Sequence, residues 1–181
     1  LVPAVAMRLW AEERRLGTLE LILTLPVTVA EAILGKFLAA WVFIGVALFL
    51  TFPMVLTVLY LGQPDIGPII MGYLGSFLMA GAFLSVGLMT SALTRSQVVS
   101  FILAVVICLF LVLAGFAPVT NVLSGWAPVW LVDLVSATSF LTHFLSMQRG
   151  VLDLRDLLYY ISVITFMLSV NGVVLQGRRT S

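Results

Sequence analysis

The stretch RLWAEERRLGTLELILTLPVTVAE, residues 8–31, is the polar segment around which the rest of this chain is organised. Six charged residues fall within its first thirteen positions, in a sequence that is otherwise almost entirely apolar, so this segment is expected to lie in water. Gly17 is suited to ending a helix, the Thr18 hydroxyl to capping the next one, and Pro26 to stopping it. We therefore expect a short helix over residues 18–25.

A longer helix is expected to begin directly after this short one. Thr28 and Glu31 have the spacing of a capping box, in which each side chain accepts a hydrogen bond from the other residue's backbone N–H. The short helix is far below the roughly 20 residues that span a bilayer. Its apolar stripe of Leu19, Ile22 and Leu23 therefore needs another partner. Two are open: the lipid headgroup layer, or a groove on a separate soluble protein.

The composition places the chain in a membrane. Of its 181 residues, 62% are hydrophobic and 9% are charged, whereas about 25% are charged in soluble domains. The formal net charge of +1 argues against nucleic acid as a partner, because binding phosphates needs clustered cations. The single cysteine, Cys108, lies in an apolar run and is interpreted as a small hydrophobe, with no disulfide and no cysteine-based metal site.

Long apolar runs predict four full membrane spans in an all-α, polytopic helical bundle. Turn-forming stretches at residues 62–68 and 91–97 separate the first three spans. Pro53 is expected to kink the first one, a cost that neighbouring helices can offset within a membrane. The predicted spans are residues 29–61, 69–93, 97–117 and 156–176.

Residues 118–155 are neither a span nor an ordinary loop. Trp126 and Trp130 fit the level of the lipid headgroups, because the indole ring is apolar while its N–H needs a polar partner. We interpret the segment as two short re-entrant helices at the outer face, broken near residues 136–139. Such a backbone is tolerated at membrane depth only when protein covers it or it lines a wet cavity.

The basic residues indicate the orientation of the chain. Four spans put residues 8–31, the turn with Arg95 and the C-terminal arginine pair on the same side, which then holds seven of the nine basic residues. Arg149 and Arg155 lie on the other side. Because basic flanks stay in the cytoplasm, the opening segment and the C-terminus are predicted to face inwards.

The sequence lacks the common motifs of catalysis and ion coupling. It has no G-x-x-x-x-G-K-[ST] loop for nucleotide phosphates, no H-E-x-x-H and no G-x-S-x-G. The predicted spans carry no charge near mid-membrane, which disfavours proton- or ion-coupled transport. Asp133, Ser139 and His143 could be drawn as a hydrolytic trio, but nothing orients them, and His143 is interpreted as a polar residue at the outer interface. A membrane protein that transports a cargo without a nucleotide site or an ion relay needs a source of energy outside its own chain.

The run E-x-x-x-G-T-x-E from Glu13 to Glu20, followed by Leu25-Pro26 and by Gly35-Lys36 at the start of a span, resembles the ABC-2 type permeases of ATP-binding-cassette transporters. The stretches SALTRSQ (91–97) and RGVLDLRDLLYY (149–160) resemble the branch that includes gliding-motility-associated permeases. The resemblance covers essentially the whole chain. It implies the permease subunit of an ATP-driven exporter, multi-pass in the bacterial inner (plasma) membrane and not itself an enzyme.

In this family one subunit has six spans, with a cytoplasmic coupling helix after the second and outer re-entrant helices before the last. By this resemblance, residues 1–181 form a single transmembrane domain from which the first two spans are missing. Residues 1–16 are then the end of an upstream span with its cytoplasmic extension, residues 18–25 the coupling helix, and residues 118–155 the re-entrant segment.

The resemblance also implies the partners: an ABC ATPase on a separate chain, which holds ATP and Mg, and a second permease subunit that forms a homo- or heterodimer with this one. Membrane lipids surround the chain, and no cofactor is expected on it. A short rigid helix between two long ones can act as a lever when the ATPase closes. The residues expected to couple to the ATPase are Glu13, Gly17, Thr18, Leu19, Glu20, Ile22 and Leu23.

Two other functions are open on the sequence alone. A non-transporting membrane scaffold would associate with no ATPase. An intramembrane enzyme would depend on Asp133 and His143 and lose its activity when either is replaced. Uncharged spans with aromatic edges suit a lipidic or amphipathic cargo, as they suit any bundle in lipid.

Overall fold

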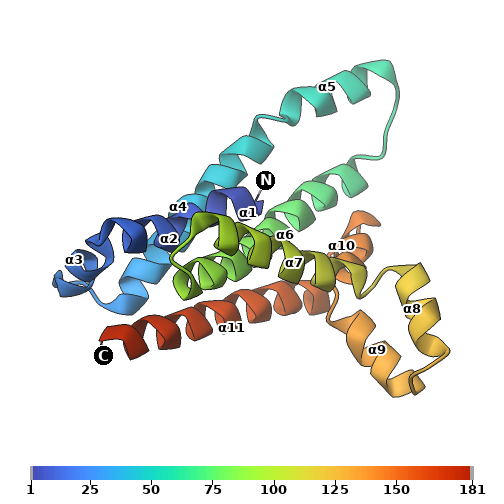
Figure 1. Cartoon of the computed structure of the whole chain (residues 1–181). Helices are drawn as coiled ribbons and strands as arrows, with labels where there is room; N and C mark the ends of the chain where they lie inside the picture. Colours follow the sequence, from blue (N-terminus) through green and yellow to red (C-terminus); the bar gives the residue numbers. More distant parts are fainter. Residues whose placement is uncertain (1, 180–181) are drawn as a thin grey trace.

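The computed structural model describes residues 2–179, except the side chains of Leu23 and Arg179, and within that range it is helical without strands (Figure 1). The first helices are short, and three later ones are long. The helices are α1 (Val2–Ala6), α2 (Arg8–Leu16), α3 (Thr18–Thr24), α4 (Val29–Phe49), α5 (Phe52–Leu61), α6 (Ile66–Leu93), α7 (Gln97–Leu113), α8 (Ala117–Ser124), α9 (Val129–Ala137), α10 (Phe140–Gln148) and α11 (Leu154–Arg179).

Several of these helices are long and apolar enough to cross a membrane. They are Val29–Leu61, which joins α4 and α5, Ile66–Leu93 and Leu154–Arg178. Two pairs, α7 with α8 and α9 with α10, are bent by 71° and 67° and raise the number of spans from 3 to 5 if each pair is one broken span. The predicted all-α, polytopic membrane fold is thereby confirmed, and the predicted number of four spans lies within this range.

Helix α6 lies at the centre of the bundle, where α1, α2, α4, α7, α10 and α11 all pack against it. Its small residues allow this close packing. A Cβ atom at Gly81 would lie 2.7 Å from the Trp41 ring, and one at Gly87 would lie 2.4 Å from Ala6 Cβ. Trp41 is held in place because its Nε1 donates to the Phe77 carbonyl at 2.9 Å.

The helix boundaries that depend on local chemistry lie close to where they are predicted. Thr28 caps α4: its Oγ1 accepts from the Glu31 N–H at 3.2 Å, and Glu31 Oε2 accepts from the Thr28 N–H at 2.9 Å. The capping box is therefore confirmed. The helix is interrupted at Leu50 and Thr51, and Pro53, which was predicted to kink this span, stands in the first turn of α5.

Other boundaries differ from the prediction. The span predicted over residues 97–117 is shorter: α7 ends at Leu113, and Pro118 lies in the first turn of α8, where its missing N–H costs nothing. The outer segment holds three short helices, α8, α9 and α10, rather than two, with the break between α9 and α10 at Thr138 and Ser139 as predicted. Helix α6 begins at Ile66, earlier than predicted, because Asp65 caps it through the Gly67 N–H.

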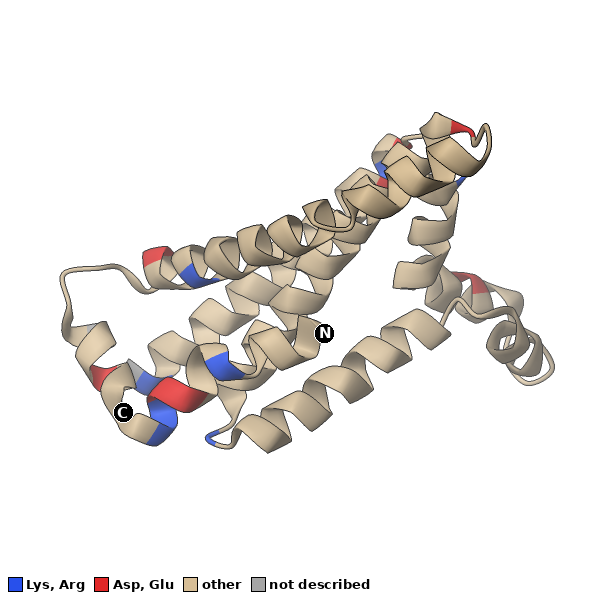
Figure 2. Cartoon of the chain, turned by 90° about the horizontal axis from the view of Figure 1, so that it is seen from above, with Lys and Arg blue, Asp and Glu red and all other residues tan. Residues whose placement is uncertain are grey.

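Charged residues gather at the two ends of the bundle and leave the middle without charge (Figure 2). One end, here called the α3 end, holds α2, α3, the start of α4, the α6–α7 turn and the C-terminus (Figure 1). The opposite end, here called the α8–α9 end, holds the α5–α6 loop, α8, α9 and the α10–α11 loop. This distribution fits helices that cross an apolar layer between two polar surfaces.

Candidate functional site

The α3 end is built around a sharp turn between α2 and α3. Gly17 adopts a left-handed conformation with φ 74°, and its N–H donates to the Arg14 carbonyl at 3.3 Å. A side chain at this position would be strained, whereas glycine adopts it freely. Leu25 ends α3 in an extended conformation before Pro26. The predicted pair of breaks around a short helix is therefore present.

Thr18 does not cap α3 as predicted. It is the first helical residue, Gly17 occupies the cap position, and the Thr18 hydroxyl donates to the Glu13 carbonyl at 3.3 Å. The hydroxyl of a residue already inside the helix cannot reach the free N–H groups of its first turn in the way a capping residue does. Thr18 instead ties α3 back to the end of α2.

Lys36 of α4 fastens α2 to the bundle. Its Nζ forms an ion pair with Glu13, donates to the Leu9 carbonyl at 2.9 Å and lies 4.8 Å from the centroid of the buried Trp10 ring. One ammonium group thus makes three contacts with α2, all within little more than one helical turn. Lys36 was predicted at the start of a span, and no partner was predicted for it.

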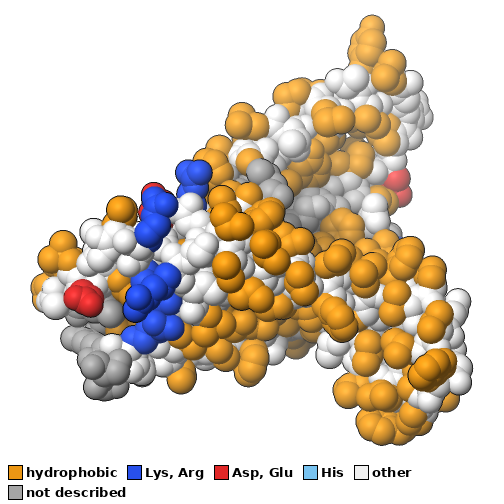
Figure 3. Space-filling model, in the orientation of Figure 1, with side chains coloured by type: hydrophobic (Ala, Val, Ile, Leu, Met, Phe, Trp, Pro, Cys, Tyr) orange, Lys and Arg blue, Asp and Glu red, His pale blue; other side chains and the backbone are white. Residues whose placement is uncertain are grey.

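Helix α2 is also fastened to the C-terminal end of α6. Arg14 Nη2 donates to the Ala92 carbonyl at 2.5 Å. Burial lowers the pKa of the Arg14 guanidinium, and the nearby charges of Arg178 and Arg95 lower it further. Lys and Arg side chains gather over this end of the molecule (Figure 3). Residues far apart in the sequence therefore meet here, as the predicted orientation requires.

The predicted coupling residues occupy different environments. Leu19 is only 8% exposed and belongs to the chain's own apolar core, and Ile22 is half-buried. Gly17, Thr18 and Glu20 are exposed. Glu13 is engaged with Lys36, and the side chain of Leu23 lies outside the described part of the chain.

The exposed apolar side chains of this region are ones that the sequence analysis did not select. Leu21 is 65% exposed, and Leu16 and Leu25 are also exposed. Leu21 lies on the side of α3 opposite to Leu19, and Leu25 follows directly after the helix. The sequence contains a signal for this exposed face, because apolar residues lie on two sides of α3. One side packs into the bundle, and the other is left free.

The hydrolytic trio considered from the sequence does not form. Asp133 is exposed, and Ser139 Oγ donates to the Val112 carbonyl at 3.2 Å. His143 is buried rather than placed at the interface, because its ring stacks on Tyr159 with centroids 3.8 Å apart and its Nδ1 lies 2.6 Å from Asp156 Oδ1. Within residues 2–179, no three His, Cys, Asp or Glu side chains are placed to hold a metal ion.

Side chains cover the broken backbone between α9 and α10. His143 Nε2 donates to the Ala137 carbonyl at 2.8 Å, the Tyr159 hydroxyl to the Thr138 carbonyl, and the Tyr160 hydroxyl to the Phe140 carbonyl at 2.8 Å. The Ala137 and Thr138 carbonyls lie at the C-terminal end of α9, where helical donors run out, and the Phe140 carbonyl lies in the first turn of α10. Broken backbone covered by protein in this way is compatible with membrane depth, as expected for a re-entrant segment.

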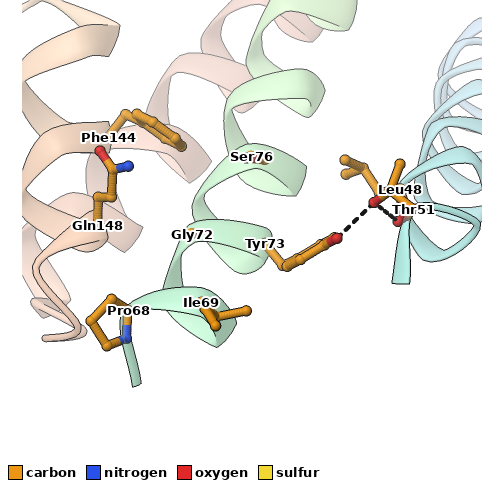
Figure 4. Close-up of a pocket in the computed structure, with 9 residues that line it drawn as sticks. All are labelled: Leu48, Thr51, Pro68, Ile69, Gly72, Tyr73, Ser76, Phe144 and Gln148. Carbon is orange, nitrogen blue, oxygen red and sulfur yellow. Dashed lines mark hydrogen bonds between the residues drawn. The ribbon is translucent and has the colours of Figure 1, made fainter. Parts of the chain in front are cut away.

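A cavity of about 480 Å³ lies beside α6, between α4 and α10. Tyr73 reaches from α6 towards Thr51, and their hydroxyl oxygens are 2.7 Å apart (Figure 4). The wall mixes polar and apolar side chains, among them Gln148 and Phe144 of α10. Such a lining can accept a molecule that is polar in one part and apolar in another.

The family model of the ABC-2 family transporter proteins matches residues 4–176. No curated protein and no solved structure matches the chain. The match includes the elbow of α2 and α3, the central helix α6 and the segment of α8, α9 and α10. It also agrees with the resemblance carried by the Glu13–Glu20 motif. The chain therefore belongs to the ABC-2 family of transporter proteins and is a membrane permease component of an ABC transporter.

Proposed function

We propose that this chain is the permease subunit of an ATP-driven exporter, and that an ATPase on a separate chain drives it through α2 and α3. The observation that carries the proposal is the form of the α3 end. A short helix stands between two fixed turns, and its outward face presents Leu21, Leu25 and Glu20. An apolar face with a charged edge fits a groove on a soluble partner.

The connections behind α3 support its role as a lever. A force applied to α3 reaches α2 across one residue, Gly17, and reaches α4 and α6 through Lys36 and Arg14. Each of these contacts is a directed polar bond rather than a loose apolar contact. Closure of an ATPase dimer can therefore displace several spans together.

The remaining parts of the proposal follow from the charge distribution and the outer cavity. The basic α3 end faces the cytoplasm of a bacterial cell, with the chain in the inner membrane and paired with a second permease subunit. ATP and Mg are held by the ATPase chains. The mixed lining around Tyr73, Thr51 and Gln148 favours an amphipathic, lipid-like cargo.

Affinity purification of the tagged permease from its native membrane tests the proposal. The wild-type chain should recover an ABC ATPase. Glu20→Lys and Leu21→Glu, which alter only exposed side chains of α3, should abolish that recovery without unfolding the spans. Gly17→Pro should do the same by changing the turn. The matched control is Leu61→Glu, at a residue that is 78% exposed at the α8–α9 end.

Equal recovery of the ATPase by Leu21→Glu, Glu20→Lys and Leu61→Glu would remove α3 as the docking element. Recovery of no ATPase by the wild-type chain would instead favour a non-transporting scaffold. Gel filtration in detergent, run on each variant, separates a docking defect from loss of the fold.

A further inference from the structure

Helices α1 and α2 form an almost continuous rod that is interrupted at Met7. In an uninterrupted α-helix the Ala11 N–H would donate to the Met7 carbonyl. Here the hydroxyl of Ser91, from α6, stands between them. Ser91 Oγ accepts from the N–H groups of Trp10 and Ala11, each at 2.9 Å, and donates to the Met7 carbonyl at 3.2 Å. A side chain inserted into the hydrogen-bond ladder is a recognised cause of a helix break.

This insertion lies in a buried environment, because Ser91, Trp10 and Ala11 are all buried. Backbone groups there find no water, so each needs a partner within the protein. One hydroxyl supplies a partner to two donors and one acceptor. The position of the break, and with it the start of α2, therefore depends on where α6 holds Ser91.

Two further contacts on α6 enclose the break. One turn before Ser91, Gly87 lets α1 approach so closely that an added Cβ would lie 2.4 Å from Ala6 Cβ. One residue after Ser91, the Ala92 carbonyl accepts from Arg14. Helix α6 thus holds the rod immediately before, within and after its interruption. Sliding or rotating α2 against α6 would break the Ser91 bonds first, because they lie at the interruption itself.

From this geometry we infer that Ser91 is the positioning residue through which movement of α2 is passed to α6. The inference rests on the proposed coupling function and names the residue that connects the lever to the central helix. Because α4, α7, α10 and α11 also pack on α6, a displacement of α6 reaches both the spans and the outer segment. Without the hydroxyl, the Ala11 N–H can close onto the Met7 carbonyl, and the break between α1 and α2 no longer follows the position of α6, although Arg14 still contacts the Ala92 carbonyl.

The variant that tests the inference is Ser91→Ala, and the chain offers a matched control. Ser85 is also a fully buried serine of α6, but its hydroxyl donates to the Ala82 carbonyl of its own helix at 2.6 Å. Ser85→Ala therefore removes the same atom from the same helix without touching α2. Both changes are made in a Cys108→Ala background, which frees the chain of cysteine for spin labelling.

The experiment measures two distances by pulsed electron–electron double resonance in the complete permease–ATPase complex in nanodiscs. An inner pair of labels at Leu16 and Val98 follows α2 against α7, and an outer pair at Ile70 and Trp130 follows α6 against α9; all four residues are exposed, and none belongs to the proposed docking face of α3. Each distance is compared without nucleotide and with ATP, Mg and vanadate. In wild type and Ser85→Ala, both distances should change with nucleotide. In Ser91→Ala, the inner change should remain and the outer change should be lost.

This pattern differs from that of a purely structural residue, whose removal would alter both distances before nucleotide is added. The inference is overturned if the outer distance in Ser91→Ala changes with nucleotide as much as it does in the wild type. It is also overturned if the outer distance in the wild-type complex does not change with nucleotide. Loss of the ATPase from Ser91→Ala also overturns it, because Ser91 would then only maintain the fold. Failure of the wild-type chain to bind any ATPase refutes the proposed function itself, which keeps the two failures distinct.

Discussion

Removing the ammonium group of Lys36 should free α2 from α4, and the structure allows the cost to be worked out. Lys36→Met keeps the length of the side chain but removes three contacts: the bond to the Leu9 carbonyl, the ion pair with Glu13 and the contact with the Trp10 ring. A charged hydrogen bond contributes about 1.5–3 kcal/mol. The partly exposed ion pair and the cation–π contact add about 0.5–1 kcal/mol each.

We therefore expect Lys36→Met to lower the free energy of unfolding by about 3 kcal/mol. Glu13→Gln should cost about 1 kcal/mol, since it removes only the ion pair. In the double variant, Lys36→Met with Glu13→Gln, the carboxylate at position 13 is absent, so no unpaired charge is left beside the apolar methionine. The loss of unfolding free energy in the double variant should therefore be about 1 kcal/mol smaller than the sum of the losses in the two single variants.

Reversible SDS titration in mixed micelles, followed by tryptophan fluorescence, measures these differences because Trp10 lies directly under the Lys36 ammonium. The reasoning is refuted if the single effects add to the double effect within about 0.5 kcal/mol, since the ion pair would then contribute nothing. A cost below about 1 kcal/mol for Lys36→Met would equally contradict the assigned contacts.

Two further predictions use the same titration. Gly81→Ala should destabilise the fold by about 1–3 kcal/mol, because its Cβ would lie 2.7 Å from the Trp41 ring, whereas Gly72→Ala meets no atom within 4 Å and should be neutral or slightly stabilising; equal effects would contradict the described α4–α6 packing. Tyr160→Phe should cost about 0.5–1.5 kcal/mol by removing a buried hydrogen bond between α11 and the first turn of α10, directly after the α9–α10 break. The control Tyr73→Phe removes a hydroxyl on an exposed contact, and a larger loss there than at Tyr160 would count against the role given to the break.

The features that could be predicted from the sequence are those whose cause is local. Helical runs of apolar residues indicate membrane spans wherever they occur, because the backbone must satisfy its own hydrogen bonds in lipid. Gly17 and Pro26 delimit α3 through their own conformational limits, and Thr28 with Glu31 marks the start of α4 within one turn. Family membership followed from motifs of the same local kind.

Features that depend on distant segments could not be predicted. Thr18 had the chemistry of a cap but lies one position too late, which only the backbone geometry shows. His143 pairs with Asp156 rather than Asp133, because α10 packs on α11 while Asp133 points to the exterior. The exposed face of α3 was likewise misassigned to the side of Leu19.

Hydropathy, turns and capping act within a few residues, so local patterns were enough to predict an all-helical membrane protein of the ABC-2 family with a polar elbow near its start. The attachment of that elbow to the bundle depends on contacts between distant segments. Ser91 and Met7 lie 84 positions apart, and a hydroxyl replaces a helical hydrogen bond only after both helices have packed. The central role of α6 has the same origin, because small residues permit close contact on every side but do not select the partners.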